Sequence, residues 1–429
     1  MALILHRKRQ TGTEGDEERD MAAKVEAPAP AAGMTGLVLT AGGARGAYQA
    51  GVLKRIGEIP ALRRKPSPFP IIAGASAGAI NGAAMAAFGS DLGAATDRLA
   101  KLWTTLRMSE VVRVDTRALA TTVARMGTDL ALGGMIGAGR TQALLDAAPL
   151  RRFLARSLPL DGIATAIDRG HLHALAITAT GYHSGRAFTF IQGRPGHALW
   201  QKSRRVALQA RLTVDHVCAS AAIPLVFPPV ALAASGAKAW FGDGAMRLTA
   251  PLSPAIRLGA EKLFAIGIRS AAVAGDLLRA ELAPGEGTYL RRPPLSQICG
   301  VFLNAIFLDH LDADLDHLER MNELVSAYQA AARKSATVEV SEPMRVVEPL
   351  CITPSEDLAV VAKTLAHRMP RSIRYVMDGL GAPEAQSADL MSYLLFDSAF
   401  TSELVHIGYR DAQLRIDEIE AFLRKPAVR

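Results

Sequence analysis

Short apolar segments alternate with helical patterns along the chain. Runs of apolar residues bounded by glycines and polar turns predict buried strands at 36–40, 173–180, 186–191 and 262–268. Helical patterns follow the first strand at 47–58 and reappear as a short helix at 213–222, which Pro224 ends. Residues 91–170 are mostly helical in pattern, with a glycine-rich interruption at 133–139 that fits either a mobile loop over a cleft or a linker.

The rest of the chain is organised around residues 70–88, which predict a buried strand, a sharp turn at Ser76 and a buried helix. Gly74 and Gly78 complete a G-x-S-x-G pattern, in which a serine sits on a strained strand-to-helix turn and exposes its hydroxyl. The new helix directs its free N–H groups toward the space above that serine. Residues 71–90 are also uncharged, but a membrane span is disfavoured because they are mostly Ala and Gly and include Asn81.

A glycine-rich loop follows the first strand, just upstream of the serine turn. It reads Ala41-Gly42-Gly43-Ala44-Arg45-Gly46, and such loops hold negative charge with backbone N–H groups. A nucleotide pyrophosphate is a poor fit, because position 41 is alanine and residues 61–66 are basic where an acidic residue is expected. A transient oxyanion needs only two converging N–H groups, and this interpretation joins the loop and Ser76 in one site.

Asp243 is a candidate base for the serine. It stands between Gly242 and Gly244 at the end of an apolar run, and an acidic residue there can activate a nearby hydroxyl. Trp240 and Phe241 would form an apolar wall that raises its pKa. Gly-Asp-Gly is equally typical of an ordinary turn. Position alone therefore does not favour a catalytic base over a turn residue.

Composition describes a globular protein: 429 residues, 49% hydrophobic and 21% charged. The three cysteines are far apart and form no C-x-x-C pair, which indicates neither a disulfide framework nor a zinc site. The net charge of +8 comes from small basic clusters spread along the chain. This pattern favours a basic surface without a specific partner, and the second interpretation is attraction to anionic lipid headgroups. No motif indicates nucleic-acid binding.

Both ends of the chain lie outside these motifs. Residues 1–33 predict a disordered leader, and their apolar stretch is too short and precedes the basic one, unlike a secretory signal. The C-terminal part predicts one strand at 345–352 and several helices, at 295–333, 355–378, 387–398 and 400–424. Residues 387–410 are apolar enough to line an acyl-chain pocket, dock on a membrane or pack on the core, and core packing is the default expectation.

Taken together, the ordered motifs resemble those of the patatin-like phospholipase family. The resemblance covers about residues 36–270 and rests on the glycine-rich loop, the serine turn and Asp243-Gly244-Ala245; the segments 219–229 and 251–256 also look like the family's connections. One departure is Ala41, where the family's loop usually begins with glycine. The resemblance implies an α/β fold with three α/β/α layers over residues 35–270, a leader at 1–34 and a mainly helical extension at 271–429 that packs on the core.

The resemblance also implies a function and a site. The chain would be a lipid acyl hydrolase of the phospholipase A or lysophospholipase type that needs no metal or cofactor, with Ser76 as nucleophile and Asp243 as base. The oxyanion hole would come from the backbone of Gly42 to Gly46, and Arg45 would position an anionic headgroup or fix the loop by pairing with a carboxylate. The expected partners are an acyl lipid and a membrane surface, with no nucleic acid and the oligomeric state open; the expected location is cytoplasmic or peripheral to a membrane.

Two alternatives remain. The first is an α/β-hydrolase triad in which Ser76 and Asp243 are joined by a later histidine, of which the candidates are His310, His317, His367 and His406. His310 and His317 lie among aspartates in a pattern typical of the solvated face of a helix. The second is a non-catalytic protein that binds an anion or nucleotide with its glycine-rich loop.

Overall fold

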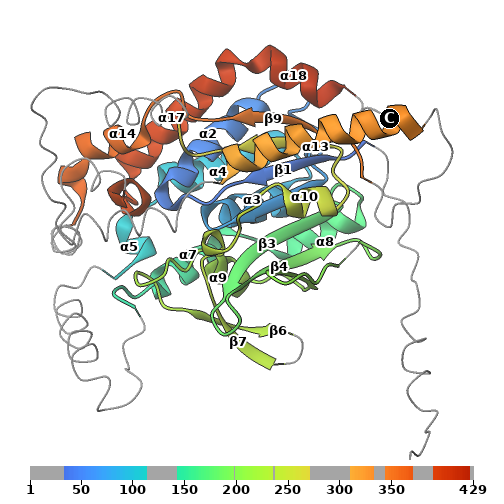
Figure 1. The fold of residues 1–429 in the computed structure, drawn as a ribbon. Helices are drawn as coiled ribbons and strands as arrows, with labels where there is room; N and C mark the ends of the chain where they lie inside the picture. Colours follow the sequence, from blue (N-terminus) through green and yellow to red (C-terminus); the bar gives the residue numbers. More distant parts are fainter. Residues whose placement is uncertain are drawn as a thin grey trace, which may run out of the picture.

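A computed structural model describes residues 33–113, 143–197, 199–234, 237–270, 310–332, 344–370 and 390–425 (Figure 1). The predicted leader and the glycine-rich segment 133–139 lie outside these residues. In the described part the chain forms one sheet of nine strands. The strands are β1 (Thr35–Leu39), β2 (Ile71–Ala75), β3 (Ala174–Gly181), β4 (Arg186–Gly193), β5 (Arg205–Gln209), β6 (Val230–Ala234), β7 (Ala237–Gly242), β8 (Lys262–Ile266) and β9 (Glu348–Ile352).

The sheet has the order β5-β4-β3-β2-β1-β8-β9, and its central strands are parallel. β4 runs antiparallel to β3, β5 runs parallel to β4, and the β6–β7 hairpin attaches where β7 pairs with the end of β3. β1, β2 and β8 are buried along their whole length, as expected of parallel strands that are covered on both faces. The carboxyl ends of β1, β2 and β3 therefore meet at one end of the sheet.

Helices cover both faces of the sheet, so the molecule has three layers (Figure 1). Successive residues of β1 point to opposite sides: Leu37 and Leu39 join the larger apolar core, and Val38 joins the smaller one. The larger core takes in α2 (Gly46–Gly57), α3 (Ala77–Phe88), α4 (Leu92–Thr104) and α17 (Ser398–Leu414), and the smaller one takes in α10 (Ser253–Arg257) and α13 (Leu311–Ala332). The predicted three-layer α/β/α fold is confirmed.

Shorter helices complete the described structure. They are α5 (Met108–Val111), α7 (Ala148–Ser157), α8 (Asp161–Asp168), α9 (Val214–Ser220), α14 (Leu358–Thr364) and α18 (Ile416–Arg424). The helix predicted at 400–424 is two helices, because the chain breaks at Arg415 between α17 and α18. The helix predicted at 355–378 ends early: α14 stops at Thr364, and the residues after 370 lie outside the described part.

The C-terminal region contributes to both the sheet and its covering layer. β9 adds to β8 as the last strand of the sheet, where the sequence predicted a further strand. α17 packs along α2, the helix that follows the glycine-rich loop, and the buried Tyr48 hydroxyl donates to Asp411 Oδ2 over 3.1 Å across that contact. In the described residues, no helix combines the length and apolar character that crossing a membrane requires.

Candidate active site

Ser76 lies at a strained turn between β2 and α3. Its backbone has φ 54° and ψ −122°, a region that residues with a side chain rarely adopt. The two flanking glycines are sterically required: a Cβ atom on Gly74 would lie 2.3 Å from the carbonyl oxygen of Gly78, and one on Gly78 would lie 2.1 Å from that of Leu39. The G-x-S-x-G segment therefore folds as the predicted turn at the carboxyl end of the sheet.

A second serine supports this turn. Ser220, at the end of α9, accepts a hydrogen bond from the Ser76 backbone N–H over 2.9 Å and donates its own hydroxyl to the Thr178 carbonyl over 2.6 Å. Ser220 is fully buried, and its two bonds join the turn to β3. The sequence analysis did not identify Ser220, because its only signal was a small polar residue within the apolar segment 219–227.

The glycine-rich loop lies beside Ser76. Gly43 has φ +53° and begins a short 3-10 helix, Gly43–Arg45, which leads into α2. A Cβ atom on Gly46 would lie 2.6 Å from the Cβ of Ala77, so the start of α2 touches the start of α3. Within the described residues, the backbone N–H groups of Gly43 and Ala44 donate no hydrogen bond. This is expected of the first N–H groups of a helix, which have no partner inside the helix.

Asp243 is fully buried at the end of β7, close to Ser76. Its Oδ1 accepts a hydrogen bond from the Ala245 N–H over 2.8 Å, and its own backbone N–H donates to the Ala222 carbonyl. Oδ2 has no hydrogen-bond partner of normal geometry within the described residues. Gly244 allows the chain to turn here, since a Cβ atom on it would lie 2.1 Å from the Thr178 carbonyl oxygen.

Burial dominates the electrostatics of this carboxyl group. It raises the pKa of Asp243 from its usual 3.8 to about 6, although the nearby Ser76 hydroxyl and the Ala245 N–H both lower it. The predicted apolar wall is half correct: Phe241 is fully buried and contacts the rings of Phe188 and Phe190, whereas Trp240 is 42% exposed. The alternation of a strand explains the difference, because neighbouring side chains point to opposite faces.

An apolar cavity opens beside Ser76. The cavity is narrow, with a volume of about 20 Å³, and Gly43 and Ser76 form part of its wall. The remaining wall is hydrophobic and comes from five regions of the chain: Ala77 and Ile80; Leu102, Trp103, Leu106 and Val111; Leu150, Phe153 and Leu154; Ala221, Ile223 and Phe227; and Phe396. The site therefore combines one hydroxyl, one carboxyl and a wall suited to hydrocarbon.

Arg45 joins the glycine-rich loop to the C-terminal part of the chain. Its side chain is only 2% exposed. Its Nε donates to Ser392 Oγ over 2.6 Å, and its guanidinium lies 4.5 Å from the centre of the Tyr393 ring. The Tyr393 carbonyl also lies against Gly43, where it would be 2.3 Å from a Cβ atom. The C-terminal segment 390–396 thus packs directly on the glycine-rich loop and supplies Phe396 to the cavity.

No described histidine is bonded to Ser76 or Asp243. His310 and His317 lie at the start of α13 and in it, on the helix that packs against the opposite face of the sheet. The pKa of Asp243 is set by burial, Ser76 and Ala245, with no imidazole among its causes. The geometry of the described residues therefore does not support the Ser-Asp-His alternative. In the same residues, no three His, Cys, Asp or Glu side chains gather closely enough to hold a metal ion.

Comparisons with known proteins bear on the same region. The family model for patatin-like phospholipase matches residues 37–256, about half of the chain. No curated protein matches the chain significantly. Among solved structures, the chain is similar to the heterodimeric ExoU–SpcU complex from the type III secretion system of Pseudomonas aeruginosa, with 17% identity, 93% of this chain and 73% of that chain covered, and a TM-score of 0.25. A TM-score this low supports no conclusion about this protein.

The matched region includes all three sequence motifs: the glycine-rich loop, the Ser76 turn and Asp243-Gly244-Ala245. These are also the elements that the fold brings to one end of the sheet. The chain belongs to the patatin-like phospholipase family, a family of lipid acyl hydrolases.

Proposed function

We propose that the protein hydrolyses fatty acyl esters of lipids through a dyad of Ser76 and Asp243. One observation carries the proposal: the buried Asp243 carboxyl lies close enough to the Ser76 hydroxyl for it to lower the carboxyl pKa, and its Oδ2 is otherwise unsatisfied. A buried acceptor without a partner is unusual, and a base must lie within reach of the proton that it removes. Membership of the family supports the same reaction class.

In this mechanism Asp243 accepts the hydroxyl proton as Ser76 Oγ bonds to the ester carbonyl carbon. The tetrahedral oxyanion receives hydrogen bonds from the free N–H groups of the glycine-rich loop, those of Gly43 and Ala44. Asp243 then returns the proton to the departing alcohol oxygen as the C–O bond breaks, which leaves an acyl-serine. Water attacks the acyl carbon, gives one proton to Asp243 and releases the fatty acid, and the proton returns to Ser76.

The apolar cavity supports a hydrocarbon acyl group rather than a polar one. Its wall near Ser76 consists of aliphatic and aromatic side chains, including Ile80, Leu154 and Phe396, so a fatty chain would bury apolar surface there and a sugar or peptide would lose hydrogen bonds. We therefore assign the substrate as a long- or medium-chain acyl ester, as in phospholipids and lysophospholipids.

Hydrolysis of a chromogenic medium-chain acyl ester tests the dyad. We expect Ser76→Ala and Asp243→Asn each to reduce the rate by at least about a thousandfold, in line with losses of essential nucleophiles and bases. His310→Ala is the matched control and should retain the wild-type rate, with folding of each variant checked by circular dichroism. Loss of activity in the histidine variant would support a triad instead. An inactive wild type that also resists labelling of Ser76 by a fluorophosphonate would refute the proposal.

A further inference from the structure

One segment of the chain has a large excess of basic over acidic residues, although basic clusters also occur elsewhere along the chain. Residues 169–260 contain ten Lys and Arg and only two acidic residues, so their net charge of +8 equals that of the whole chain. Of the two acidic residues, Asp243 is fully buried, and Asp215 accepts two hydrogen bonds from Arg151. The surface that this segment presents therefore carries cations with almost no carboxylates among them.

The fold gathers five of these cations at one end of the sheet, which we call the cationic edge: Arg186, Lys202, Arg204, Lys238 and Arg247. Arg186 and Arg204 are adjacent, because Ala187 N–H donates to the Arg204 carbonyl over 3.0 Å. Lys202 N–H donates to the Arg205 carbonyl in the same turn. The Arg247 guanidinium lies beside the turn between β3 and β4, 3.5 Å from the Cβ position of Gly185. Within the described residues, Arg186, Arg204, Lys238 and Arg247 form no ion pair with a carboxylate.

Two exposed aromatic residues belong to the β3–β4 turn and to strand β7, which also carries Lys238. Tyr182 and Trp240 are each 42% exposed, and Tyr182 N–H donates to the Trp240 carbonyl over 3.0 Å. Trp240 belongs to the β6–β7 hairpin, which projects from the lower end of the molecule in Figure 1 and pairs Trp240 with Ala231. Tyr and Trp are favoured where one side of a ring meets hydrocarbon and the other meets water.

The cationic edge lies at the same end of the sheet as Ser76. β7 pairs with the last residues of β3 and then leads directly into Asp243. A surface that binds at the β6–β7 hairpin would therefore lie against the end of the sheet that carries the serine, the carboxyl group and the apolar cavity. An enzyme whose substrate is embedded in a bilayer needs this arrangement.

We propose that the cationic edge docks the protein on a bilayer that carries anionic lipids, with Trp240 and Tyr182 at the lipid–water interface. This inference rests on the proposed function and extends it, because it states that the acyl ester is taken from an anionic membrane surface. Lys and Arg beside an anionic leaflet each strengthen binding, and aromatic side chains add interfacial affinity. The alanine-rich hairpin around Trp240 favours a membrane over a nucleic acid, whose phosphates and bases would leave that apolar surface unused.

Trp240 is also a built-in reporter of this contact. The chain has three tryptophans, and Trp103 and Trp200 are 1% and 6% exposed. Addition of vesicles with phosphatidylglycerol in phosphatidylcholine should shift the Trp240 emission to shorter wavelength, and brominated acyl chains should quench it. Trp240→Phe should remove the response. Pure phosphatidylcholine vesicles and high salt should greatly weaken it, since salt screens the attraction.

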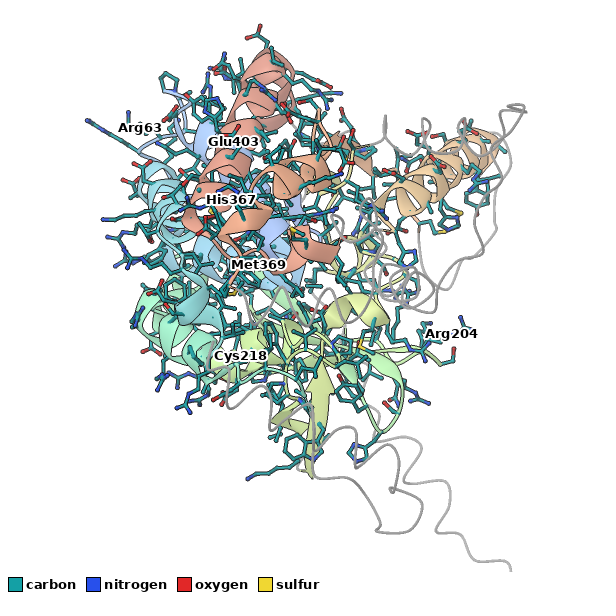
Figure 2. All side chains as sticks on the ribbon, turned by 90° about the vertical axis from the view of Figure 1, so that its left-hand side faces the viewer. Arg63, Arg204, Cys218, His367, Met369 and Glu403 are labelled. Carbon is teal, nitrogen blue, oxygen red and sulfur yellow. The ribbon has the colours of Figure 1, made fainter. Side chains whose placement is uncertain are left out.

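A matched pair of triple variants tests the charge. We expect Lys202→Gln/Arg204→Gln/Lys238→Gln to weaken co-sedimentation with anionic vesicles by about a hundredfold. The control, with Gln at the three exposed cations Arg63, Arg64 and Lys65, should bind as the wild type does. Figure 2 shows Arg63 and Arg204 at opposite sides of the molecule. Equal losses in both variants, or equal binding to neutral vesicles, would overturn the proposal. The proposal would also be overturned if the wild type bound duplex DNA more tightly than anionic vesicles and the Lys202→Gln/Arg204→Gln/Lys238→Gln variant lost that DNA binding.

The two proposals fail separately. Ser76→Ala should bind anionic vesicles normally, because the serine lies outside the cationic edge. Vesicle binding by a wild type that hydrolyses no acyl ester would refute the proposed function and keep the docking surface. Hydrolysis of a soluble ester without charge-dependent vesicle binding would refute the docking surface and keep the dyad.

Discussion

Replacement of Asp243 by asparagine should inactivate the enzyme and also stabilise its fold. The carboxyl group is fully buried near the Ser76 hydroxyl, with Oδ1 bonded to the Ala245 N–H and Oδ2 without a hydrogen bond of normal geometry. Asparagine has nearly the same shape, keeps the acceptor at Oδ1 and places a neutral amide where the charged oxygen stood. The cost of burying a negative charge is thereby removed.

The magnitude follows from the pKa. Burial raises the pKa of Asp243 from its usual 3.8 to about 6, which corresponds to about 3 kcal/mol of free energy against folding at pH 7. The native state binds the proton more tightly than the unfolded chain, so stability falls as the pH rises from about 4 to 6 and stays low above that range. Against a typical total of roughly 5–15 kcal/mol, the effect is large.

Urea unfolding of the wild type and of Asp243→Asn at pH 4 and pH 7 measures this effect. We expect the variant to gain about 3 kcal/mol at pH 7 and almost nothing at pH 4, whereas the exposed Asp168→Asn should change little at either pH. Esterase activity of the wild type should fall below a pH of about 6, as the same carboxyl group becomes protonated. A gain that is the same at both pH values, or a loss of stability at pH 7, would refute the reasoning.

Two further variants test the loop beside Ser76. Gly43→Ala should reduce kcat at least about tenfold, because alanine is strained at φ +53° and its Cβ would collide with segment 390–396. Gly185→Ala has a similar φ of +62°, but its Cβ would meet only the end of the Arg247 side chain, 3.5 Å away, so this control should retain esterase activity. Ser392→Ala removes the 2.6 Å bond from Arg45, and we expect kcat to fall severalfold with KM nearly unchanged. Ser253→Ala, which removes a different serine–arginine bond, should leave kcat as it is, and equal effects in the two serine variants would contradict a role of the loop.

Local sequence patterns were sufficient to predict the strands and the turn that carry the candidate site residues. Glycines at fixed offsets from Ser76 are required by the turn itself, because a Cβ on Gly74 or Gly78 would overlap backbone, and uniformly apolar segments form the buried strands on either side. β9 at the edge of the sheet was also predicted, since residues 348–352 have a strand pattern. In each case the signal lies within a few residues of the feature that it predicts.

Features that depend on distant partners could not be predicted in this way. β5 and β6 were missed, because each gains its pairing from a strand that local sequence does not reveal. Ser220 and Ser392 are ordinary small polar residues until the fold places them against Ser76 and Arg45. The contacts of Arg45 with the Ser392 hydroxyl and the Tyr393 ring could not be predicted for the same reason, because the two residues lie 347 and 348 positions further along the chain.

The part of the chain outside the family match shapes the site as well. The match ends at residue 256, yet segment 390–396 supports the glycine-rich loop through Arg45 and closes part of the cavity with Phe396. A cavity wall determines which acyl chains fit, because each added or missing methylene changes the buried apolar surface. We therefore expect the acyl-chain preference of this protein to depend on residues that its family motifs do not include. Substitution of Phe396 by a smaller residue would alter that preference without touching Ser76 or Asp243.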